Sequence, residues 1–313
     1  GRHRTWNNAS ELKTGHIGRP KDVIDCADRA KWPQQQEWML VKLNKFDHVK
    51  AVLFDVYGTL FVSGSGDVGT TATTDTAEAL TQALVVSGFS GELDQAGLVG
   101  KDMLKAEILE WHTAGHEAGV DFPEVEISKV WKKIIYSLRN TQTLTTPNVE
   151  LDQIRRLSLE YECRVNPVFP MPESIETISA IKDKGLALGI VSNAQFYTPL
   201  LFPAFFDQTV EDCGFDPDCC IWSFRELKAK PSESLFPKAG KFLREKYNIG
   251  LGEVVYVGND MLNDIYCAKQ AGCKTVLFAG DQRSLRLREN DERCLAIQPD
   301  AVITSLSQLV EIL

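Results

Sequence analysis

Four short groups of polar residues, each next to an apolar segment or a predicted helix, could together act on an anion. The first is Asp55, which ends the apolar run 51–54 and is soon followed by Tyr57 and a glycine. A carboxylate directly after a buried strand is poorly placed for packing, whereas open parallel sheets bind their ligands at that edge. Asp55 is therefore the first candidate for a reacting group.

Two further groups carry hydrogen-bond donors. Ser192 and Asn193 follow the apolar run 186–191, and a hydroxyl and an amide there can donate to an oxyanion. Lys230 precedes Pro231, at which we predict that a helix starts. This would place an ammonium beside the free backbone N–H groups of a helix N-terminus, and both favour an anion. Each signal has an ordinary alternative, a turn in one case and an exposed lysine in the other.

The fourth group follows the predicted strand 253–258 and contains Asn259, Asp260 and Asp264. Oxygen ligands clustered at a strand end suit Mg²⁺, which keeps several of its waters. Asn259 can bind through its carbonyl oxygen but brings no charge. Capping of the next helix is the alternative reading, and it suits Asn263 better than the whole group.

The order of these groups resembles the four motifs of haloacid dehalogenase-like (HAD) hydrolases, the first of which reads D-x-D-G-T-L. The resemblance implies a covalent nucleophile at Asp55, an oxyanion-binding hydroxyl at Ser192 beside Asn193, and a charge-offsetting ammonium at Lys230. It also implies a Mg²⁺ site, for which the predicted ligands are Asp55, the Tyr57 backbone carbonyl, Asn259, Asp260 and Asp264.

The chain departs from the phosphatase pattern at two positions. Tyr57 replaces the second Asp, which acts as acid and base in phosphatases of this family, and Asn259 replaces the first Asp of the fourth motif. Tyr at position 57 resembles the 2-haloacid dehalogenase branch, D-x-Y-G-T-L. That branch holds the halide with an arginine some thirty residues after the nucleophile, and this chain has no arginine between Asp55 and Arg139.

We favour an enzyme that acts on a phosphorylated small molecule with Mg²⁺. A good leaving group, such as that of an acyl phosphate, would tolerate Tyr57, whose ordinary pKa near 10 makes it a poor base. The first alternative is a dehalogenase-like hydrolase of carbon–halogen bonds. The second is a HAD-fold protein that binds such a ligand with little or no turnover.

The elements that must position these residues alternate between strand and helix after residue 166. This alternation predicts an α/β fold with a doubly wound parallel sheet. About a hundred residues of helical pattern interrupt it after the first strand, where HAD hydrolases carry a helical cap. The predicted parts are an N-terminal helical extension (1–48), the first core strand (49–62), a helical cap (63–165) and the rest of the core (166–313).

The composition limits the classes of partner that we expect this protein to bind. The chain has 313 residues, 43% of them hydrophobic, and a net charge of −9, which argues against a nucleic-acid groove. No apolar run approaches the ~20 residues of a membrane helix, so we expect no membrane partner. Eight cysteines without a C-x-x-C pair predict reduced thiols and a cytoplasmic location. An anionic small-molecule substrate is the expected partner, and the sequence leaves the oligomeric state open.

Overall fold

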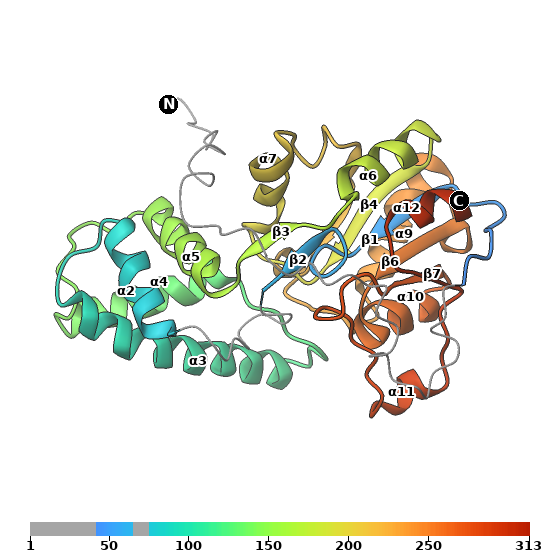
Figure 1. Cartoon of the computed structure of the whole chain (residues 1–313). Helices are drawn as coiled ribbons and strands as arrows, with labels where there is room; N and C mark the ends of the chain where they lie inside the picture. The colour runs from blue at the N-terminus through green and yellow to red at the C-terminus, as the bar shows by residue number, and fades with distance from the viewer. Residues whose placement is uncertain (1–41, 65–74) are drawn as a thin grey trace.

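A six-stranded parallel sheet forms the centre of the computed structural model, which describes residues 42–64 and 75–313 (Figure 1). Every pair of neighbouring strands in it is parallel. The strands lie in the order β5 (Phe215–Trp222), β4 (Ala187–Ser192), β1 (Ala51–Phe54), β6 (Val254–Gly258), β7 (Lys274–Phe278) and β8 (Ala301–Ile303). The predicted α/β fold with a doubly wound parallel sheet is confirmed.

Strand β1 is buried on both faces, which explains its uninterrupted apolar sequence. Val52 and Phe54 pack into one core cluster, and Ala51 and Leu53 pack into another. The first cluster includes side chains of α6 (Ser174–Asp183) and α12 (Ser307–Ile312). The second includes side chains of α9 (Leu235–Tyr247) and α10 (Cys267–Gln270). Alternation along one strand thus fixes which helices cover which face.

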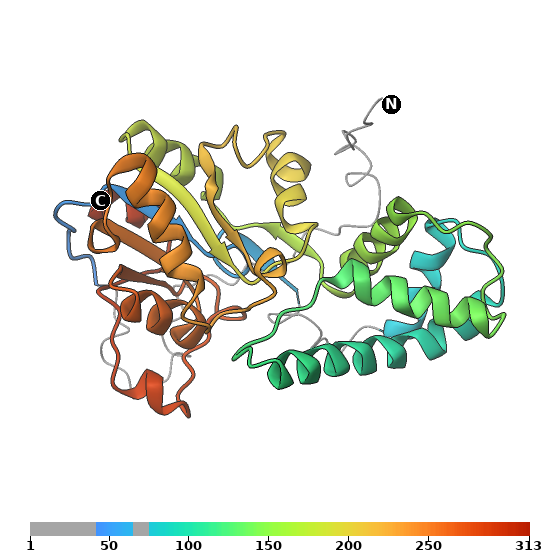
Figure 2. The same cartoon turned by 180° about the vertical axis from the view of Figure 1, so that it is seen from behind.

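Four helices inserted between the strands β2 and β3 form a separate group to one side of the sheet, as Figures 1 and 2 both show. They pack around their own apolar cluster, which includes Leu84, Trp131, Ile134 and Leu157. The helices are α2 (Thr76–Val86), α3 (Leu93–Glu117), α4 (Ile127–Asn140) and α5 (Leu151–Val165). The helical pattern predicted after the first strand is therefore present as these four helices.

The segment after Leu60 begins with a strand that the sequence did not predict. Its first residues form β2 (Phe61–Ser63), which pairs antiparallel with β3 (Val168–Pro170). A pairing partner more than a hundred residues away leaves no local signal, so the strand could not be read from its neighbours. This two-stranded ribbon carries the chain out to the inserted helices and back.

Two predicted helix starts were also wrong. Pro231 does not open α9, which begins at Leu235, and the helix expected from Asn263 begins earlier, as the π-helix η5 (Met261–Tyr266) that runs into α10. The remaining short helices lie in loops of the core. They are η3 (Thr198–Leu200), α7 (Leu201–Phe206), α8 (Ser223–Glu226), η4 (Leu251–Glu253) and α11 (Glu292–Leu295).

The predicted N-terminal helices lie almost entirely outside the described residues, which begin at Lys42. From there, Lys42 forms a backbone bridge with Val302, and the Phe46 N–H donates to the carbonyl of Ile312. Among the described helices, none combines the length and apolar character needed to cross a bilayer.

Ile134 provides a test of the separate core of the inserted helices, because it is fully buried there. We expect Ile134→Ala to lower the free energy of unfolding by about 2–5 kcal/mol, the usual cost of such a cavity. Hydrogen exchange should accelerate in α2–α5 before it accelerates in β1, β4 and β6. The matched control is Leu109→Ala on α3, where the side chain is 67% exposed, and its effect should stay within about 0.5 kcal/mol. Simultaneous loss of protection in helices and sheet would contradict a separate core.

Candidate active site

Three neighbouring strands deliver polar side chains to one edge of the sheet. Asp55 follows β1, Ser192 ends β4 and Asn259 follows β6, and β1 lies between the other two strands. The backbone N–H of Asp55 donates to the carbonyl of Val257 at 2.9 Å, which holds the end of β1 against β6. Because parallel strands end together, the predicted nucleophile lies between the second and fourth motifs.

A buried ammonium joins two of the carboxylates. Lys230 Nζ donates to Asp55 Oδ1 at 2.9 Å and to Asp264 Oδ1 at 2.5 Å, and all three residues are buried. It also donates to the hydroxyl of Tyr256 at 2.9 Å. Burial alone would lower the pKa of Lys230, but Asp264 and Asp55 outweigh burial and raise the pKa above its usual value. Lys230 is therefore a permanent cation between two carboxylates.

Asp264 is the most enclosed carboxylate of the site. Its Oδ2 accepts from the backbone N–H groups of Asn259 and Asp260, both at 2.9 Å, and its Oδ1 accepts from Lys230 and Tyr256. A Cβ on Gly258 would lie 2.3 Å from Asp264 Cγ, so only glycine permits this approach. Burial raises the pKa of Asp264 to about 7, with Lys230 opposing and Asp55 reinforcing the shift.

Asp260 points toward an arginine that follows β7. Arg288 donates to Oδ1 and Oδ2 of Asp260 through Nε at 3.1 Å and to Oδ2 through a terminal nitrogen at 2.5 Å. Asp260 also caps the start of η5 by accepting from the N–H groups of Leu262 and Asn263. Asp260, rather than Asn263, is therefore the cap, because its carboxylate precedes the first turn and faces the free N–H groups.

The hydroxyl of Tyr57 is not placed to transfer a proton at Asp55. The hydroxyl bonds to Thr198 Oγ1 at 3.0 Å, and the ring packs against the core. Burial, followed by the nearby carboxylate of Glu162, raises the pKa of Tyr57 far above its usual value. The hydroxyl stays protonated and cannot serve as a base.

Asn259 is held tightly beneath the first turn. Its Oδ1 accepts from Thr59 Oγ1 at 3.1 Å, and its Nδ2 donates to the carbonyl of Ser284 at 2.6 Å. Gly58 has a φ of +82°, and a Cβ there would lie 2.5 Å from Asn259 Nδ2. The glycine of the first motif therefore allows both a left-handed turn and close contact with the fourth motif.

Ser192 and Asn193, the two residues predicted from the second motif, make different contacts. Ser192 is fully buried, and its hydroxyl donates to the carbonyl of Asn193 at 3.3 Å. Asn193 clamps the backbone of Lys230, since its Oδ1 accepts from the Lys230 N–H at 2.7 Å and its Nδ2 donates to the Lys230 carbonyl at 3.2 Å. Asn193 thus positions the lysine, which precedes α9 by several residues instead of lying at its N-terminus.

A cavity of about 80 Å³ opens among these groups, enough for one small anionic group or a few waters. All predicted site residues line it except Ser192. Its other lining residues are Ser63, Asn166, Asn263 and Arg286. The three carboxylates of Asp55, Asp260 and Asp264 are balanced by Lys230, Arg286 and Arg288. The site as a whole is therefore close to neutral before any ligand binds.

The sequence match agrees with this arrangement. A sequence model described as haloacid dehalogenase-like hydrolase matches residues 49–272, more than half of the chain. The chain belongs to this family of hydrolases. Its predicted membership of the HAD superfamily is therefore confirmed.

Curated relatives within this family include phosphatases. The chain is 27% identical to a phosphoglycolate phosphatase of Escherichia coli (strain K12), over 86% of this chain and 94% of the relative. It is 28% identical to a glyceraldehyde 3-phosphate phosphatase of Pyrococcus furiosus, over 51% of this chain and 66% of the relative. The fold is similar to that of a 2-haloacid dehalogenase from Pseudomonas syringae, with a TM-score of 0.50, 20% identity, and coverage of 84% and 97% of the two chains.

Sequence reasoning missed several residues of the HAD hydrolase site. Tyr256 looked like one more residue of a buried strand, although a tyrosine among valines is itself a signal that a hydroxyl needs a partner. Asn166 and Ser63 gave no sequence signal. Arg286 and Arg288 were not among the predicted site residues, although one lines the cavity and the other pairs with Asp260.

Lys230→Met tests the buried charge network. The change leaves Asp55 and Asp264 buried without their cation, and we expect a loss of about 3–5 kcal/mol in the free energy of unfolding near pH 8. Without Lys230 the pKa of Asp264, which burial already raises, should rise further, so the stability of the variant should fall as the pH rises and the loss should shrink at pH 5. Urea unfolding at both pH values measures this.

The matched control for this change is Lys238→Met. Lys238 is an exposed lysine that pairs with Glu226 at the surface. Its removal should cost no more than about 1 kcal/mol at either pH. Equal losses for the two variants, or a larger loss at pH 5 than at pH 8 for Lys230→Met, would show that the ammonium does not neutralise the site.

Proposed function

We propose that this HAD hydrolase uses Asp55 as a covalent nucleophile on a small anionic substrate whose leaving group departs without protonation. The observation that carries the proposal is the placement of Tyr57. Its buried hydroxyl bonds to Thr198 and cannot donate or accept a proton near Asp55 at neutral pH. With no acid–base group at this position, substrates with poor leaving groups lose a contribution of roughly 10²–10⁴-fold in rate.

A phosphorylated small molecule is the favoured substrate, and acyl phosphates meet the leaving-group requirement. The names of the curated relatives support phosphoryl chemistry. The cavity beside Asp55 offers Lys230, Arg286 and Asn193 to the phosphoryl oxygens. An Asp55 oxygen would form a bond to phosphorus while the bond to the carboxylate leaving group breaks. Water would then attack the phosphorus and return Asp55 as a carboxylate beside Lys230.

The described residues contain no group of three or more acidic, histidine or cysteine side chains arranged to hold a metal ion, so a Mg²⁺ here would have to keep most of its waters. Asp55 Oδ2 accepts no hydrogen bond from the described residues, the Tyr57 carbonyl lies on the turn after β1, and Asn259 Oδ1 lies on the turn after β6. Asp260 and Asp264 would have to release Arg288 or Lys230 to take part. When bound, Mg²⁺ would offset negative charge on the phosphoryl oxygens.

Hydrolysis of a carbon–halogen bond is the second candidate, because Lys230 and Arg288 already balance Asp264 and Asp260 without a metal. Here Asp55 would attack carbon and release halide. Water would then hydrolyse the resulting ester at the Asp55 carboxyl carbon. Binding without turnover is the third outcome that the experiments below distinguish.

The inserted helices serve as a cap in this proposal, with residues 63–165 as the cap and 49–62 and 166–313 as the core. The cavity is lined from both parts, since Ser63 and Asn166 lie where the insertion leaves and rejoins the core. Closure there would exclude water from the reacting groups. A cytoplasmic location remains a prediction from the cysteine pattern.

The decisive experiment offers acyl phosphates, alkyl phosphates and 2-haloacids, with and without Mg²⁺, in water enriched in ¹⁸O. Phosphoryl transfer should place ¹⁸O in the released phosphate, whereas attack on carbon should place it in the Asp55 side chain after several turnovers. Asp55→Asn should lower kcat by at least about 10³-fold. The control Asp102→Asn changes an exposed aspartate of α3 and should leave kcat unchanged. Full activity of Asp55→Asn would exclude covalent catalysis by this residue.

Tyr57→Phe tests the leaving-group argument. Because the hydroxyl bonds only to Thr198 among the described residues, we expect kcat on acyl phosphates to change by less than about threefold. Loss of that hydrogen bond should cost about 1 kcal/mol of stability. Steady-state kinetics and urea unfolding measure the two effects. A drop of kcat by a hundredfold or more would mean that the Tyr57 hydroxyl takes part in the reaction.

A further inference from the structure

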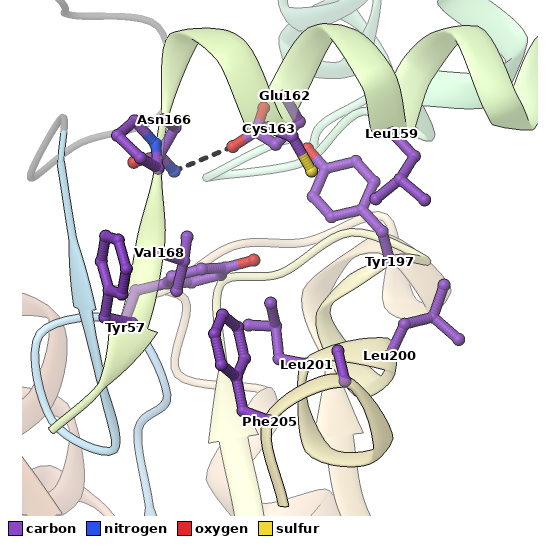
Figure 3. Close-up of a pocket in the computed structure, with 13 residues that line it drawn as sticks. Tyr57, Leu159, Glu162, Cys163, Asn166, Val168, Tyr197, Leu200, Leu201 and Phe205 are labelled. Carbon is purple, nitrogen blue, oxygen red and sulfur yellow. Dashed lines mark hydrogen bonds between the residues drawn. The ribbon is translucent and has the colours of Figure 1, made fainter. Parts of the chain in front are cut away.

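A second, larger cavity of about 340 Å³ adjoins the one beside Asp55, within the usual range for small-molecule pockets (Figure 3). It lies between α5, β3 and the segment formed by η3 and α7. Tyr57 and Asn166 line both cavities, so the two spaces share a wall. A ligand held at Asp55 could therefore extend past these two residues into the larger space.

The walls of the larger cavity are mainly apolar. Leu159, Val168, Leu201 and Phe205 point into it, as Figure 3 shows, and Ala204 completes the α7 side. None of the thirteen described residues that line it is lysine, arginine or histidine. A carboxylate entering this cavity would lose its hydration without gaining a cation, which is costly.

The one acidic lining group does not change this character. Glu162 accepts from Asn166 Nδ2 at 2.8 Å (Figure 3). Asn166 Oδ1 in turn accepts from the hydroxyl of Ser63 at 2.7 Å. Burial raises the pKa of Glu162 above its usual value, although hydrogen bonds from Asn166 and Tyr197 oppose the shift. Glu162 therefore brings no positive charge to this cavity, and a second anion gains nothing from this group.

We infer that the larger cavity binds an uncharged, apolar organic group of the substrate while the smaller cavity holds its reacting anion. This assignment deepens the proposed function and rests on it. The preferred substrates are then phosphorylated compounds with an aliphatic or aromatic tail, and small compounds that carry a carboxylate besides the phosphate, such as phosphoglycolate, are poor ones. It also explains an aromatic ring at position 57, since Tyr57 forms part of the wall between the two subsites.

The test is a chain-length series of acetyl, butanoyl and hexanoyl phosphate. Each methylene that enters the cavity should raise kcat/KM by about fourfold, or about 10²-fold from acetyl to hexanoyl phosphate. Succinyl phosphate should be at least tenfold poorer than butanoyl phosphate, because its terminal carboxylate would enter the apolar cavity. A flat series, or succinyl phosphate as the better substrate, would overturn the inference while leaving the proposed function intact.

Ala204→Phe should fill the cavity without reaching the residues beside Asp55. Ala204 is 6% exposed and lines only the larger cavity. We expect kcat/KM to fall at least tenfold for hexanoyl phosphate and to stay within about twofold for acetyl phosphate. Ala114→Phe, on the exposed face of α3, is the matched control and should change neither value. If Ala204→Phe does not fold, Ala204→Leu should give the same pattern with a smaller loss.

Binding of ligands that cannot be hydrolysed tests the cavity assignment independently of the proposed reaction. Calorimetry with methylphosphonate and hexylphosphonate, which are not hydrolysed, should show tighter binding of the longer ligand to the wild type. Ala204→Phe should abolish that difference. If these results hold and no acyl phosphate is turned over, the cavity assignment stands and the proposed function fails. Equal affinity for the two phosphonates would overturn the cavity assignment.

Discussion

The ammonium of Lys230 is the interaction on which the candidate site depends. It is buried between Asp55, directly after β1, and Asp264, in η5, which follows the adjacent strand β6. A buried cation is tolerated only when it is paired and hydrogen-bonded, and here Tyr256 completes its shell. The amide of Asn193 fixes the Lys230 backbone from a third strand. Lys230 therefore links the segments that follow β1, β4 and β6 at the edge where chemistry is possible.

Tyr57 links reactivity to substrate choice. In a phosphatase of this family a carboxyl at this position would handle the proton of the leaving group. Here an aromatic ring takes its place, its hydroxyl tied to Thr198 and its face toward the core. The same ring borders both cavities, so the residue at the acid–base position also shapes the space beside the candidate site.

Contacts between the inserted helices and the core are polar as well as apolar. Gln195, just after β4, accepts from the N–H of Ile127 and donates to the carbonyl of Val125. Ser223 donates to the carboxylate of Glu124 at 2.7 Å. Burial raises the pKa of Glu124, with the Ser223 hydrogen bond opposing it. These bonds anchor the start of α4 to the same strand ends that carry Asn193, so the position of the insertion is coupled to the site.

The sequence by itself determined the alternation of strands and helices, the family, and which strand ends carry polar groups, because apolar periodicity and short motifs are local signals. The order of the four motifs predicted that Asp55, Lys230 and Asn259 belong to one site. Only the tertiary structure decided their partners. The pairing of Asp260 with Arg288, the role of Tyr256, the strand β2 and the apolar cavity between α5 and α7 all join residues distant in the chain. Such contacts depend on packing between elements, which leaves no pattern within any one of them.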